Sequence, residues 1–131
     1  MLGRKDFTPD EIFAAIDAVR TQLAAFRALP AAASGDLEAT YFNGMTLALD
    51  RRFVHRLRAV AGKDGTPLNE LEMIVESLTN NGGVLRPLSP IKYDAGTSVL
   101  GIGIGEPIAL TAEQFEKLTT AVFDELSTKF A

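Results

Sequence analysis

The chain contains no cysteine and only one histidine, His55. Without cysteine, disulfide bonds, thiolate metal sites and cysteine nucleophiles are all excluded. A single imidazole cannot build a histidine-rich metal site, and no Asp or Glu stands four positions from His55. We therefore predict a protein without a bound metal ion or cofactor.

Long apolar runs are also missing from the chain. No stretch approaches the roughly 20 apolar residues that span a bilayer, and the first residues lack the apolar core of a signal peptide. We expect a cytoplasmic protein that makes no membrane contact. Its 131 residues fit one domain (residues 1–131), and a content of 47% hydrophobic and 23% charged residues is ordinary for a soluble globular chain.

Motifs that would identify a catalytic activity are incomplete. The alternating glycines from Gly101 to Gly105 are followed by Glu106, so the Gly-x-Gly-x-x-Gly fingerprint of dinucleotide-binding loops fails. No Gly-x-Ser-x-Gly nucleophile elbow is present either. The sequence leaves open whether the protein is an enzyme.

The apolar and basic residues are most concentrated in residues 36–63, which we interpret as one long central helix. Its apolar stripe moves from one side to the other along the stretch, so the two halves must pack against different surfaces. Such a helix would be roughly 40 Å long and would project from a lone globule of this size. Because Asn43 and Gly44 form a turn signal, two shorter helices remain an alternative.

Two further helices flank this stretch. Thr8 is expected to cap the first helix, with Pro9 at its first position and an apolar seam from Ile12 to Phe26. Residues 31–35 are predicted to be a short connection, so that the central helix returns antiparallel to the first. A short third helix is expected to begin at a cap on Asn69 and to end in residues 80–83.

The pattern changes after residue 84. Residues 91–93 and 98–104 are predicted to form a β-hairpin, which residues 107–110 would extend to a three-stranded antiparallel meander. A capping box at Thr111 and Gln114 then opens the last helix, which we expect to cover the aliphatic face of the sheet. The predicted fold is therefore α+β and mainly helical, with two long antiparallel helices, a short third helix, the small sheet and a C-terminal helix.

A basic cluster on the central helix is the strongest candidate site. Guanidinium groups bind carboxylate and phosphate through a planar fork, so residues from the cluster and from the end of the third helix would hold one anion together. The predicted ligand-binding residues are Arg51, Arg52, His55, Arg56, Arg58, Asn80, Asn81 and Arg86. The alternative is that the arginines pair with carboxylates of the later helices or of a second copy. Nucleic acid is an unlikely partner because the net charge is −4.

Several short segments carry a family resemblance. At residues 41–45, 53–56, 62–65, 68–70 and 80–86 the chain resembles a group of small soluble proteins of high-GC Gram-positive (actinobacterial) bacteria. The resemblance implies a cytoplasmic location, and it supplies neither an activity nor catalytic residues.

The leading functional hypothesis is a non-enzymatic soluble protein that acts through self-association or partner binding. We expect a homodimer with Tyr41, Phe42 and Met45 at a two-fold interface, because exposed apolar surface on a projecting helix needs a cover. The alternative hypothesis is a small-molecule-binding protein or an enzyme for an anionic ligand that bears phosphate or carboxylate.

Overall fold

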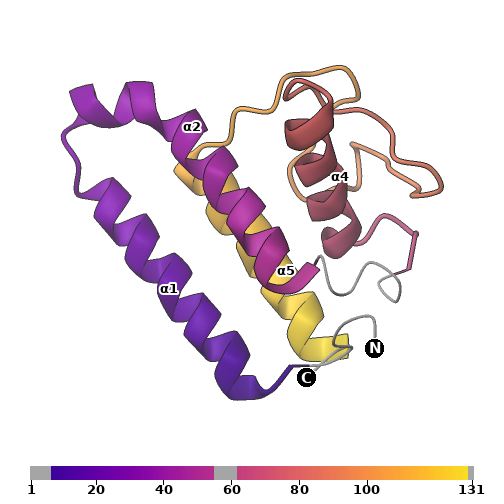
Figure 1. Ribbon diagram of the computed structural model, residues 1–131, viewed down its shortest axis with the longest axis horizontal. Helices are drawn as coiled ribbons and strands as arrows, with labels where there is room; N and C mark the ends of the chain where they lie inside the picture. The colour runs from indigo at the N-terminus through magenta and orange to yellow at the C-terminus, as the bar shows by residue number, and fades with distance from the viewer. Residues whose placement is uncertain (1–6, 55–61, 130–131) are drawn as a thin grey trace.

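The computed structural model of the protein describes residues 7–54 and 62–129. Within these residues the chain forms α-helices and one π-helical turn, which are α1 (Pro9–Arg27), α2 (Ala31–Leu49), η1 (Asp50–Val54), α4 (Pro67–Asn80) and α5 (Ala112–Lys129). The η1 turn continues α2 without a break in the chain. Successive α-helices run in alternating directions, and the segment between α4 and α5 runs around α4 (Figure 1).

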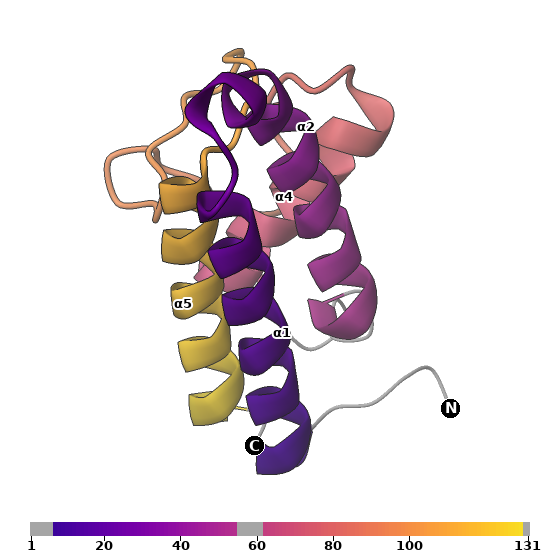
Figure 2. The same cartoon turned by 90° about the vertical axis from the view of Figure 1, so that its left-hand side faces the viewer.

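The hydrophobic core lies where α5 meets the other helices. α5 packs along α1, with which it is antiparallel, and it also contacts α2 and α4 (Figure 2). Phe42 of α2 is fully buried, with its ring 4.7 Å from that of Phe26 in α1 and 5.2 Å from that of Phe115 in α5. The three rings fix the distances between three helices, and the apolar seams expected for the first and last helices are the faces that they bury.

Two predicted helix starts are confirmed. The Thr8 hydroxyl accepts a hydrogen bond from the Glu11 amide at 3.2 Å. At the start of α5, the Thr111 hydroxyl accepts from the Gln114 amide at 3.1 Å, and the Gln114 side chain accepts from the Thr111 amide at 3.0 Å. Each contact satisfies an amide that the first helical turn leaves without a partner.

The start of α4 differs from the prediction. Thr66, and not Asn69, is the cap residue, and Pro67 occupies the first helical position. Asn69 stands at the third position, where its side-chain oxygen accepts from the Thr66 amide at 3.2 Å. The sequence was misleading because Asn69 does belong to the capping box, as its returning member. The predicted end is confirmed, since α4 stops at Asn80.

The central helix begins earlier than predicted. Residues 31–35 form its first turns and not a connection. Alanine is the best helix former, and Pro30 occupies the N-cap position just before the helix. The helix is continuous through Asn43 and Gly44, so the two-helix alternative is wrong. It leaves α geometry at Asp50, and residues 55–61 of the predicted stretch lie outside the described residues.

The predicted α+β class is wrong, because the described residues contain no strand. The expected hairpin or meander at residues 91–93, 98–104 and 107–110 is absent, and the pairing there is one isolated antiparallel bridge between Val84 and Pro107. Gly101 has φ of +69° and Gly105 has φ of +90°, which turn the backbone out of the extended conformation. α5 therefore covers other helices and not a sheet.

Side chains from the helices form hydrogen bonds with the backbone of the segment that was predicted to form a sheet. The side-chain amide of Asn43 donates a hydrogen bond to the backbone carbonyl of Ile108 at 2.9 Å, and its oxygen accepts one from the backbone amide of Leu110 at 3.2 Å. The buried Glu70 carboxylate accepts from the amides of Val99 and Leu100 at 2.7 and 3.0 Å. These contacts satisfy backbone groups that form no helix or sheet ladder.

Replacing Asn43 should therefore destabilise the fold. Asn43→Ala removes both contacts and leaves two buried backbone groups unsatisfied, so we expect the free energy of unfolding to fall by about 2 kcal/mol. Urea denaturation measures this change. The control is Asn80→Ala, whose exposed side chain bonds Glu76 on its own helix; equal effects of the two substitutions would contradict the role assigned to Asn43.

The raised pKa of Glu70 predicts that the stability of the fold depends on pH. Burial raises the pKa of Glu70 above its ordinary value, although its two backbone hydrogen bonds and Lys117 lower it. The folded protein then holds this proton at a pH where the unfolded chain has released it, and the associated stabilisation is lost as the pH rises through the folded pKa.

The measurement compares the wild type with Glu70→Gln, which cannot titrate. The free energy of unfolding of the wild type, relative to that of Glu70→Gln, should fall as the pH is raised from about 4.5 towards neutrality. Glu76→Gln, the same replacement on the same helix, is the control for the loss of a carboxylate. A relative stability that stays constant or increases with pH would rule out the interpretation.

Candidate functional site

The predicted anion-binding residues fall into three groups. Arg51 and Arg52 belong to η1, and both are exposed. The central members, His55, Arg56 and Arg58, lie outside the described residues. The structure therefore describes only the first two arginines of the basic cluster.

The remaining members lie at the end of α4. The Asn80 amide donates to Glu76 at 2.8 Å, Asn81 follows as the cap residue, and Arg86 is exposed shortly beyond it. Because α4 runs antiparallel to α2, this end of α4 points away from η1 (Figure 1). The described members of the set do not meet at one point, and an anion site centred on residues 55–58 stays a prediction.

Arg52 occupies a distinctive position. Its guanidinium lies 5.8 Å from the centre of the Phe53 ring, a distance at which a cation is attracted to an aromatic face. The ion pairs between described residues are Arg27 with Glu116, Lys63 with Glu72 and Lys129 with Glu125, and Arg52 takes part in none of them. The predicted pairing of the basic cluster with later carboxylates is thus absent for this arginine.

Arg52 also lines two neighbouring hollows. One has a volume of about 470 Å³ and is lined by Phe7, Asp10, Glu11, Ala14, Arg52 and Phe53. The other, of about 110 Å³, is a cleft between α1 and α2 lined by Ala15, Ala18, Val19, Gln22, Met45, Ala48, Leu49, Arg52 and Phe115. We call the second the α1–α2 cleft.

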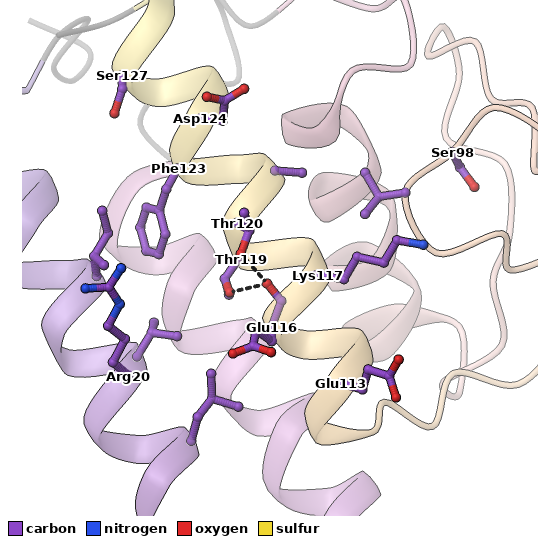
Figure 3. Close-up of a pocket in the computed structure, with 15 residues that line it drawn as sticks. Arg20, Ser98, Glu113, Glu116, Lys117, Thr119, Thr120, Phe123, Asp124 and Ser127 are labelled. Atoms are coloured by element: carbon purple, nitrogen blue, oxygen red, sulfur yellow. Dashed lines mark hydrogen bonds between the residues drawn. The ribbon is translucent and has the colours of Figure 1, made fainter.

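A broader hollow of about 980 Å³ follows α5 (Figure 3). Leu23 and Phe123 are buried members of its lining. Arg20 stands on the α1 side, and Lys117 and Ser98 lie on the other flank of α5. Two positive side chains (Arg20 and Lys117) and three negative ones (Glu113, Glu116 and Asp124) line it, so it does not present a single sign of charge.

Two threonine hydroxyl groups in this hollow are already engaged. Thr119 and Thr120 both donate to the Glu116 carbonyl, at 3.0 and 2.8 Å (Figure 3). The Glu116 carboxylate binds Arg27 through two hydrogen bonds of 3.2 and 3.3 Å, which lower the pKa of Glu116 and raise that of Arg27. These interactions tie the surface of α5 to itself and to α1, and they do not activate a nucleophile.

The outer face of α2 is the other candidate surface. It is formed by residues that are exposed and fall within about 100° of arc on the helix, and we call it the α2 outer face. Its members are Leu37, Thr40, Gly44, Leu47 and Ala48. Leu37 is 40% exposed and Leu47 is 38% exposed. Residues 39–49 contain no charged side chain, which makes this exposed surface uncharged.

The α2 outer face is not the dimer surface that the sequence suggested. Phe42 is fully buried against α1 and α5, and Tyr41 stacks on Phe26 with ring centres 5.5 Å apart. Met45 lines the α1–α2 cleft. The expected interface residues thus pack within one chain, and the α2 outer face lies opposite Phe42 on the helix and borders Tyr41.

Comparisons with known proteins identify no relative. No family model, curated protein or solved structure matches the chain. The resemblance to small actinobacterial proteins therefore stays a prediction. Within the described residues, no helix is long and apolar enough to cross a membrane, and no group of three or more potential metal ligands is present.

Most residues that define the two surfaces were not predicted from the sequence, although Arg52 and Met45 were named in other roles. The α1–α2 cleft depends on the small side chains of Ala15 and Ala18. Both helices show ordinary apolar spacing, so the sequence did not indicate that these alanines leave space between them. A signal for the α2 outer face was available in the eleven uncharged residues 39–49. A helix that is apolar on every side is normally covered on every side.

Proposed function

We propose that the protein is non-enzymatic and acts through self-association, forming a homodimer across the α2 outer face. The observation that carries the proposal is an exposed helix surface of several turns without a charged residue. The buried polar groups favour a non-enzymatic role, because Asn69, Glu70 and Glu125 each bind backbone amides and hold the fold together.

Gly44 is the second argument for a covered surface. A glycine inside a helix costs about 1 kcal/mol relative to alanine. Nothing lies within 4 Å of a Cβ atom built on Gly44, so no contact within the chain requires its small size. A neighbouring helix that crosses close to the backbone would require it.

A second copy fits this surface better than an unrelated partner does. In an antiparallel pair related by a two-fold axis level with position 42, Leu37 of one copy lies beside Leu47 of the other. Thr40 likewise lies beside Gly44. The large residues then meet at both ends and the small residues in the middle, which is the self-complementarity that an isologous interface needs.

The size of the surface sets the expected affinity. Leu37 and Leu47 are ten positions apart, so the contact is about 15 Å long. Two helices that touch over this length bury less than the roughly 1,600 Å² of a standard interface. We therefore expect a dissociation constant of tens of micromolar or weaker.

Sedimentation velocity over a range of concentrations tests the dimer. The wild type should change from a species of about 14 kDa to one of about 28 kDa as the concentration rises to hundreds of micromolar. Leu47→Glu should remain monomeric, because it buries a charge on the two-fold surface. Circular dichroism would check that the fold is retained.

The matched control is Phe13→Glu. Phe13 is 65% exposed on α1, far from the proposed surface, so its replacement removes even more exposed apolar area. This variant should dimerise like the wild type. A wild type that stays monomeric throughout, or an equal loss in both variants, would refute the proposed interface.

A cross-linking experiment tests the register. The chain has no cysteine, so Thr40→Cys and Gly44→Cys introduce the only thiols. A disulfide needs Cα atoms within about 7 Å, which the proposed register provides between positions 40 and 44 of different copies. A mixture of the two variants should cross-link faster than either variant alone; equal rates would exclude this register.

A further inference from the structure

We propose that the α1–α2 cleft binds a small amphipathic carboxylate, with the carboxylate on Arg52 and an aliphatic chain between the two helices. This site shares only Ala48 with the α2 outer face. It takes from the predicted anion site only one member, Arg52.

The cleft suits an aliphatic chain. Its walls are small or apolar side chains, including Ala15 and Ala18 on α1 and Met45 and Leu49 on α2, and Phe115 closes it from α5. Its volume of about 110 Å³ is of the order of the dry apolar cavities that take up molecules the size of benzene. A chain of about four to six carbons is the expected occupant.

Arg52 supplies the charge complementarity. It is the charged residue among those that line the cleft, and it takes part in no ion pair between described residues. The guanidinium of Arg52 offers the planar fork to which a carboxylate can bind through two parallel hydrogen bonds. The expected ligand is therefore an apolar chain with a carboxylate that binds the Arg52 guanidinium.

Two acids limit how the ligand enters. Asp10 and Glu11 line the neighbouring hollow of about 470 Å³, on which Arg52 also borders. A carboxylate on that side would meet like charges, whereas the lining of the cleft contains no acid, so the cleft is the more favourable approach to Arg52. Asp10→Asn should strengthen binding slightly by removing part of the repulsion.

The experiment is a ligand-observed NMR titration at constant ionic strength with hexanoate, acetate, hexanol and hexylamine. Hexanoate should bind with a dissociation constant of about 1 mM. The other three should each bind at least about tenfold more weakly, because acetate lacks the chain and hexanol and hexylamine lack the anion. Arg52→Gln should weaken hexanoate binding about tenfold or more. Ala18→Leu should abolish it by filling the cleft.

Arg51→Gln is the matched control, since it removes an exposed guanidinium next to Arg52 and should change binding less than about twofold. Circular dichroism would establish that Ala18→Leu keeps its helices. No hexanoate binding by the wild type, equal binding of hexylamine or hexanol, unchanged binding in Ala18→Leu, or equal losses in the two arginine variants would each overturn the proposal. None of these outcomes depends on dimerisation.

Discussion

Hydrogen bonds from helix side chains to the backbone of residues 62–66 and 81–111 are the interactions on which the rest of the structure depends. A backbone without helix or sheet must find other partners for its buried groups. Asn69 binds the amides of Gly65 and Thr66 and the carbonyl of Gly62. Asn43 and Glu70 do the same for the later segment. The irregular segment is thereby fixed to α2, which the aromatic core holds, and to α4, which packs against α5.

This arrangement explains which parts of the fold could be predicted. The helices at both ends follow from local signals, an apolar seam and a threonine cap, and both signals act within a few residues. The predicted strands rested on alternation alone, and alternation cannot show that Gly101 turns the chain. Nor can it show that Tyr93 donates a hydrogen bond to the Ile102 carbonyl, which closes a loop where a strand was expected.

The candidate surfaces show the same limit. Arg52 could be chosen from the sequence because charge is visible there, but its neighbours in the cleft come from α1 and α5 and depend on how three helices meet. The anion site was predicted from angles around one ideal helix, and η1 departs from that geometry where the arginines begin. Asn43 was noticed as a turn signal, whereas its side chain serves a segment more than sixty positions away.

The composition of α2 connects the fold to both proposals. Phe42 fills the side of α2 that faces the core, and Met45 and Leu49 form the wall of the cleft. Both sides are apolar for reasons within the chain. The side with Leu37, Gly44 and Leu47 has no such reason. It is exposed in the described part of the chain, and an exposed helix side normally carries charged residues. The proposed second copy would supply the missing reason, and it would leave most of the cleft uncovered because the two surfaces share only Ala48.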